Sequence, residues 1–77
     1  MEDFGKTLAA IRTYRGMTQD QLAEASGVTE NAIARYESER NQPRADTVVK
    51  LADALDCSVD LLLGRTPLVV KFQGEEA

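Results

Sequence analysis

The sequence contains no histidine, no tryptophan and a single cysteine, Cys57, among its 77 residues. A lone cysteine cannot close an intramolecular disulfide, and without histidine no zinc centre of the usual cysteine–histidine type can assemble. The same absences leave no serine–histidine–aspartate or cysteine–histidine set for nucleophilic catalysis. We therefore expect a protein of a reducing compartment that is not an enzyme and that has no catalytic residues, no metal site and no cofactor.

Long apolar stretches are also missing. No segment approaches the roughly 20 apolar residues that a membrane-spanning helix needs, and the acidic start MEDFGKTLAA lacks the apolar region of a signal peptide. We therefore expect a cytoplasmic protein with no membrane partner. With 43% hydrophobic residues, the chain has enough apolar surface for the core of one small domain.

The net charge of −4 argues against a nucleic-acid partner when it is taken alone. The charges are unevenly distributed, however. Residues 1–44 carry six Lys or Arg and seven Asp or Glu, whereas residues 45–77 carry three and six. Because a nucleic-acid surface needs locally placed cations rather than a basic chain, the first part of the sequence remains able to provide one.

Short amphipathic segments separated by glycines predict an all-α domain. Phe4, Leu8 and Ile11 have the spacing of one apolar helix face. Asp3 is the expected cap of this first helix, and Gly16 is its expected end.

The segment TQDQLAEASGVTENAIARYE predicts two further helices on either side of one glycine. Thr18 and Gln21 fit a capping box, Gly27 takes a left-handed turn cheaply, and Thr29 can cap the next helix. Although a helical hairpin in any bundle can have the same glycine turn, two helices joined by so short a turn are typical of a helix-turn-helix unit. Its second helix would project a polar face outward, and a cylinder about 10–12 Å across fits a DNA major groove about 12 Å wide.

Two more helices are expected after the loop that contains Pro43. The segment ADTVVKLADAL, residues 45–55, has helical apolar spacing. A short last helix is expected in DCSVDLLLG, with Ser58 as its cap and Gly64 at its end. Asp56, between the two, stands where a left-handed residue is needed, and aspartate tolerates that conformation better than most residues.

The sequence divides into a helix-turn-helix domain, residues 1–64, and a C-terminal tail, residues 65–77. The tail contains LVVKF, a β-branched run that is typical of a strand. An unpaired apolar strand is an association site, so this run could pair with the same segment of a second subunit. A disordered end is the alternative.

Three segments carry a family resemblance: MTQDQLAEASGV, IARYESER and VVKLADALDCSVDLLLG, with a proline between the last two. Together they resemble the Cro and phage-repressor (XRE-like) family of regulators. The resemblance covers residues 4–64 and implies a compact, five-helix, lambda-repressor-like fold. It further implies a sequence-specific transcriptional regulator, in particular a repressor, that binds a short palindromic operator in double-stranded DNA. Such a protein acts as a homodimer on half-sites about 34 Å apart.

The resemblance also implies which residues contact DNA. Glu30, Asn31 and Arg35 match positions that face base edges. Their chemistry is suitable, because arginine can bond to guanine, asparagine to adenine and glutamate to the cytosine amine. Contacts to the DNA backbone are implied for residues at two helix starts and around the loop after the third helix: Thr18, Gln19, Thr29, Ser38, Arg40 and Arg44. Arg12 and Glu37 match an interior ion pair that would hold the third helix at a fixed angle.

Simpler explanations remain open for several of these residues. Glu30 suits the positive end of a helix dipole without any base contact. Arg35 could bind a phosphate instead of a base, and Gln19 could be an ordinary helix residue. Arg12 and Glu37 could form an exposed pair that contributes less than about 1 kcal/mol.

Two positions depart from the family pattern. Glu39 stands where a glycine usually ends the third helix, and Arg44 stands where a serine or threonine usually caps the fourth. The loop after the third helix therefore lacks the usual turn glycine of the family, and Arg44 adds a cation to it. An alternative function is an antitoxin-like subunit that neutralises a partner protein and binds DNA for autoregulation, which the acidic composition and the strand-like tail would suit.

Overall fold

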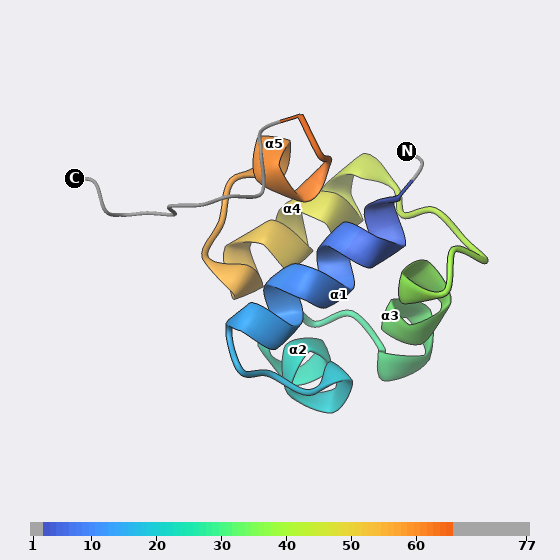
Figure 1. Cartoon of the computed structure of the whole chain (residues 1–77). Helices are drawn as coiled ribbons and strands as arrows, with labels where there is room; N and C mark the ends of the chain where they lie inside the picture. Colours follow the sequence, from blue (N-terminus) through green and yellow to red (C-terminus); the bar gives the residue numbers. More distant parts are fainter. Residues whose placement is uncertain (1–2, 66–77) are drawn as a thin grey trace.

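The computed structural model describes residues 3–65 and contains five helices and no strand within that range (Figure 1). The helices are α1 (Phe4–Tyr14), α2 (Gln19–Ser26), α3 (Glu30–Glu37), α4 (Ala45–Leu55) and α5 (Val59–Leu62). The expected all-α, five-helix fold is therefore confirmed. The strand expected at LVVKF, residues 68–72, lies outside the described residues. None of the described helices has the length and apolar character that crossing a membrane requires.

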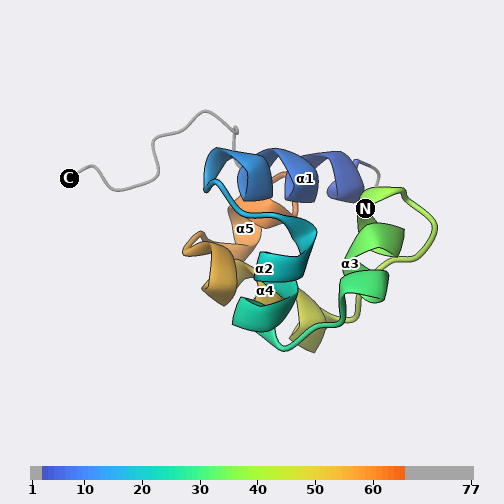
Figure 2. The ribbon, with the colours of Figure 1, turned by 90° about the horizontal axis from the view of Figure 1, so that it is seen from below.

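The helices enclose one apolar core. α1 packs against α3 and α5, α2 packs against α3 and α4, and α4 packs against α5. Figure 2 shows α1 along one edge of this arrangement, with α2 and α3 on neighbouring sides below it. Every helix contributes buried hydrophobic side chains, namely Phe4, Leu8, Ile11, Leu22, Ile33, Val48, Leu51, Ala52, Leu55, Leu61 and Leu62. Burial of each large side chain contributes about 1.5–3 kcal/mol to folding.

Side-chain caps begin α2, α3 and α5, as the sequence predicts. Thr18 Oγ1 accepts from the Gln21 backbone N–H at 3.0 Å, and Gln21 Oε1 accepts from the Thr18 N–H at 2.9 Å. Thr29 Oγ1 accepts from the Ala32 N–H at 3.1 Å, and Ser58 caps α5 in the same way. Each cap satisfies an N–H group that the helix leaves unpaired, which contributes about 1 kcal/mol.

Left-handed residues end the helices at the expected positions. Gly27 follows α2 with a φ of 78°, and Gly64 closes the turn after α5 with a φ of 79°. Asp56 follows α4 with a φ of 56°, the conformation expected for it. Arg44, which precedes α4, makes no side-chain capping bond. Helix α4 therefore begins without the side-chain cap that a serine or threonine at this position would provide.

The cap expected at the start of α1 is wrong. Asp3 has a φ of 65°, whereas a capping side chain needs an extended backbone, and it makes no capping bond. The Lys6 backbone N–H, in the first turn of α1, instead donates to Glu39 Oε2 at 3.3 Å. An acceptor that lies 33 residues away in the sequence therefore takes over the role of the local cap.

Gly5 allows α1 to approach the backbone of α3 more closely than any other residue would. A β-carbon at this position would lie 2.3 Å from the Tyr36 carbonyl oxygen and 2.7 Å from that of Glu37. Both are backbone atoms, so relief requires one helix to move. The first turn of α1 can therefore lie against the last turn of α3 because residue 5 has no side chain.

Replacing Gly5 with alanine should destabilise the protein, although alanine is the better helix former by about 1 kcal/mol. The cost of moving α1 away from α3 should exceed that gain, so the free energy of unfolding should fall by about 2 kcal/mol. Urea unfolding followed by circular dichroism measures the change. Thr13→Ala, at an exposed position of α1, is the control and should stay within about 0.5 kcal/mol of the parent. An unchanged midpoint for Gly5→Ala would contradict the close approach.

Candidate nucleic-acid interface

The turn between α2 and α3 leaves α3 at the edge of the molecule. The Gly27 N–H donates to the Ala23 carbonyl at 2.9 Å, and its left-handed backbone redirects the chain toward the Thr29 cap. Ile33 then packs into the core with no exposed surface. Figures 1 and 2 both show α3 beside α2, with the opposite side of α3 facing solvent.

The three residues expected to contact bases lie on that solvent-facing side. Glu30, Asn31 and Arg35 are all exposed. Within residues 3–65, their side chains make no intramolecular hydrogen bond or ion pair. Their donors and acceptors are therefore available to a ligand, and the base contacts themselves stay a prediction.

Thr18 and Thr29 combine a structural role with an available donor. Each hydroxyl oxygen accepts a capping bond from a backbone N–H, and each side chain is exposed. A hydroxyl group can accept and donate at the same time. The proton of each threonine can therefore reach an outside acceptor, such as a phosphate oxygen, without loss of the cap.

Gln19 and Ser38 already have intramolecular partners. Gln19 Nε2 donates to Glu37 Oε1 at 2.9 Å, and Ser38 Oγ donates to the Arg35 carbonyl at 3.1 Å. The second amide proton of Gln19 would be available to a phosphate, whereas Ser38 would have to give up its bond to Arg35. The phosphate contact of each residue stays a prediction.

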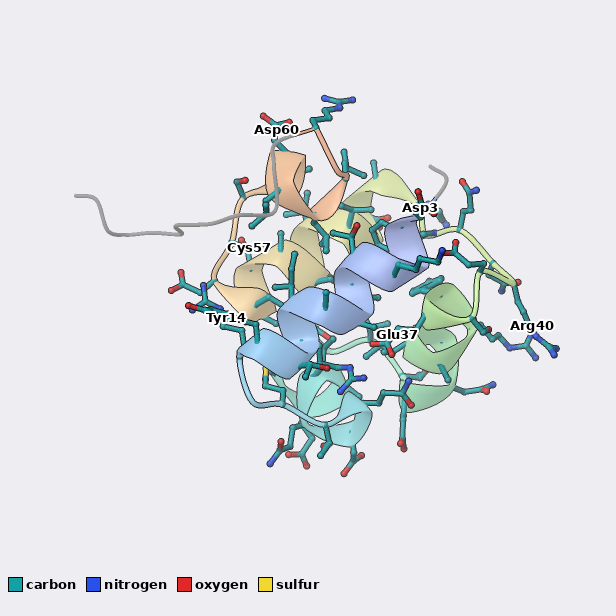
Figure 3. The ribbon with its side chains drawn as sticks, viewed as in Figure 1. Asp3, Tyr14, Glu37, Arg40, Cys57 and Asp60 are labelled. Atoms are coloured by element: carbon teal, nitrogen blue, oxygen red, sulfur yellow. The ribbon has the colours of Figure 1, made fainter. Side chains whose placement is uncertain are left out.

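Arg40 and Arg44 lie in the loop between α3 and α4, and both are exposed. Figure 3 shows the Arg40 side chain directed away from the body of the molecule. Arg44 Nε lies 3.8 Å from Asp46 Oδ1, but the two side chains are 87% and 65% exposed. Exposed pairs of this kind contribute little, so the guanidinium groups of both arginines can move to an incoming phosphate.

Arg12 of α1 and Glu37 of α3 form an interior ion pair. Arg12 Nε and Nη2 donate to the two Glu37 carboxylate oxygens at 2.6 and 3.1 Å. The side chains are 17% and 9% exposed, which excludes a solvent-exposed pair. Figure 3 shows Glu37 between the two helices. Arg12 Nη1 also donates to the Met17 carbonyl at 2.7 Å, so all three guanidinium nitrogens have partners.

The hydrogen bond to Glu37 raises the pKa of Arg12 above its usual value, against the opposing effect of burial. A raised pKa for a basic group means that its contribution to stability is lost only when the pH rises through that pKa. The usual pKa of arginine already lies far above neutral pH. The pair should therefore be insensitive to pH on the Arg12 side throughout the neutral range.

Arg15 makes a second contact between helices that the sequence analysis did not identify. Its Nε and Nη2 atoms donate to the Leu55 and Asp56 carbonyls, each at 2.8 Å. These carbonyls belong to the end of α4, where unpaired C=O groups and the helix dipole favour a cation. Arg15 thus ties the end of α1 to the end of α4.

Burial raises the pKa of the Cys57 thiol, and the nearby Arg15 cation opposes this in part. The neutral thiol is therefore favoured at neutral pH, and a neutral thiol is a poor nucleophile. Cys57 packs against the core as a small apolar residue would.

The chain matches the helix-turn-helix family over residues 8–62. It is 46% identical over 56 residues to the HTH-type transcriptional repressor RghR of Bacillus subtilis (strain 168), a match that covers 71% of this chain and 42% of RghR. It is 34% identical over 71 residues to the immunity repressor protein of Bacillus phage phi105, covering 92% and 49% of the two chains. The chain spans about half the length of the curated relatives it matches.

The crystal structure of an HTH_3 family transcriptional regulator from Vibrio cholerae has the same arrangement of helices. It matches with a TM-score of 0.78 at 24% sequence identity. The match covers 86% of this chain and 37% of the other. At this level of identity the comparison shows a common fold.

Removal of either partner of the interior ion pair should destabilise the protein strongly, because the other charge would be left unpaired. Arg12→Met and Glu37→Leu should each lower the free energy of unfolding by about 3–5 kcal/mol. The double variant should lose less than the sum of the two, since no unpaired charge remains. Urea unfolding of the four proteins measures this coupling. The exposed pair Arg44 and Asp46 is the control, with a coupling below about 1 kcal/mol. Additive losses at Arg12 and Glu37 would contradict the interior pair.

Proposed function

Because the chain belongs to the helix-turn-helix family, we propose that it is a DNA-binding regulator of transcription. More specifically, it is a repressor that occupies a short palindromic operator as a homodimer. The observation that carries the proposal is the exposed polar side of α3, where Asn31 and Arg35 face solvent while Ile33 anchors the helix in the core.

The residue types on α3 suit the edges of base pairs in a major groove. Arg35 can donate two hydrogen bonds to a guanine, and Asn31 can bond to both the donor and the acceptor of an adenine. Glu30 can accept from a cytosine amine. Each good pair would discriminate against a wrong base by about 1–3 kcal/mol, so two or three of them support a specific operator.

Contacts to phosphates would set the register of α3 in the groove. Thr18 and Thr29 offer hydroxyl donors at the starts of α2 and α3, where helix N-termini favour anions. Arg40 and Arg44 offer cations in the following loop. These contacts carry no sequence information, but they position the residues that do.

Repression is supported by two of the relatives, because RghR and the phi105 protein are both named repressors. Occupancy of an operator is the simplest mechanism that a domain of this size allows. A homodimer would double the number of base contacts and place two copies of α3 about 34 Å apart, one helical turn of DNA. A protein with this function would work in the cytoplasm, the location expected from the composition.

Selection of bound sites from a pool of random duplexes tests the proposal, and the expected result is a short sequence with two-fold symmetry. Arg35→Ala should then weaken binding to that operator by roughly tenfold to a hundredfold and relax the preference at one position of each half-site. Arg65→Ala removes an exposed arginine that follows α5 and is the matched control. Equal losses for the two variants would count against α3 as the recognition element.

Binding should also depend only moderately on salt. Arg40 and Arg44 provide two candidate phosphate-binding cations in each subunit, because Arg35 is assigned to a base. Neutralisation of about four phosphates by a dimer predicts a slope of about −4 for the logarithm of the binding constant against the logarithm of salt concentration. A titration between low and physiological salt measures this slope. A value near −10 would show that further cations contact the DNA.

A further inference from the structure

The turn that follows α3 contains a residue in a conformation that favours glycine. Glu39 has a φ of 66°, and its N–H donates to the Tyr36 carbonyl at 3.1 Å. The next N–H, of Arg40, donates to the Arg35 carbonyl at 2.9 Å. This pair of bonds forms a Schellman motif, whose left-handed position is usually glycine because a β-carbon is strained there.

The side chain of Glu39 makes a contact that glycine cannot make. Its Oε2 atom accepts from the Lys6 N–H at 3.3 Å, in the first turn of α1. The negative charge thus lies at the positive end of a helix whose own N-terminal residue, Asp3, provides no capping bond. The carboxylate therefore connects the start of α1 to the chain segment that leaves α3.

Two further contacts join the same parts of the molecule. The first turn of α1 lies against the Tyr36 carbonyl at Gly5, and the Phe4 and Tyr36 rings form an edge-to-face pair with centroids 6.4 Å apart. Figure 2 shows the start of α1 beside the end of α3. The loop that begins at Glu39 therefore starts from a fixed point on α1, and Arg40 is its next residue.

We propose that Glu39 is a positioning residue for DNA binding. By holding the α1 amide, its carboxylate fixes the direction of the loop and so the approach of Arg40 to the DNA backbone. The inference rests on the proposed function, because it concerns the same interface. It differs from a simple electrostatic role, since an acidic residue beside a phosphate should by itself weaken binding.

Glu39→Gly and Glu39→Gln test the proposal on the full chain with the selected operator. Glycine relieves the backbone strain and removes the side-chain contact, so operator affinity should fall by about threefold to tenfold while the urea midpoint stays close to that of the parent. Glutamine retains an oxygen acceptor of the same reach. The operator affinity of Glu39→Gln should be no lower than that of Glu39→Gly. If the charge of the carboxylate strengthens the contact, the affinity of Glu39→Gln should lie between those of Glu39→Gly and the parent.

Asp56→Gly is the matched control, because it also removes one acidic residue from a left-handed position. Asp56 follows the last residue of α4. Figures 1 and 2 show that end of α4 on the side of the molecule away from α3. The operator affinity of the Asp56→Gly variant should not fall. All variants are compared at a temperature at which circular dichroism shows each to be folded. Amide hydrogen exchange at Lys6 should be faster in Glu39→Gly than in the parent, and it should be unchanged in Asp56→Gly.

Operator binding by Glu39→Gly that equals or exceeds that of the parent would overturn the proposal, as would an equal loss in Asp56→Gly. Unchanged exchange at Lys6, or weaker binding by Glu39→Gln than by Glu39→Gly, would do the same. A parent chain that selects no duplex would contradict the proposed function and this inference together. Tight binding by the parent with no effect of Glu39→Gly would overturn this inference alone.

Discussion

The charged hydrogen bonds between Arg12 and Glu37 fix the position of α3, a helix that buries little apolar surface. α3 has eight residues, and Ile33 is the fully buried side chain among them. Apolar contacts of Ile33 and the partly buried Tyr36 alone do not fix the rotation or tilt of the helix, because the hydrophobic effect has no direction. Hydrogen bonds do have direction. Glu37 accepts from Arg12 of α1 and from Gln19 of α2, so two neighbouring helices fix α3 through one carboxylate.

Helix α1 holds the elements of the candidate interface in place, although none of its own residues is expected to contact DNA. Its first turn lies against the end of α3 at Gly5, and its last turn holds Glu37 through Arg12. Its last turn leads to Arg15, which holds the carbonyls at the end of α4. Substitutions along one helix would therefore change the orientation of α3 from a distance, through contacts that are specific and mostly polar.

Most features that depend on near neighbours were predicted from the sequence, with the cap at Asp3 as the exception, whereas two contacts between distant residues were not. The capping box of Thr18 and Gln21 joins residues three positions apart, so their identities are sufficient to indicate it. The acceptor for the Lys6 amide comes from Glu39, and the need for Gly5 comes from the backbone of α3. Neither can be inferred from local spacing. The ion pair was expected because of a family resemblance, since residues 25 positions apart carry no periodic signal.

The contacts of the acidic residues also bear on how a chain of net charge −4 could bind DNA. Glu37 is paired with Arg12 in the interior, and the Glu39 carboxylate accepts from the start of α1. Two of the negative charges nearest the end of α3 are thus directed toward donors of the protein itself. Arg35 and Arg40 lie on the same part of the chain and are exposed. Because fields of exposed charges are screened over about 8 Å at physiological salt, a duplex beside α3 would respond to these local cations more than to the total charge.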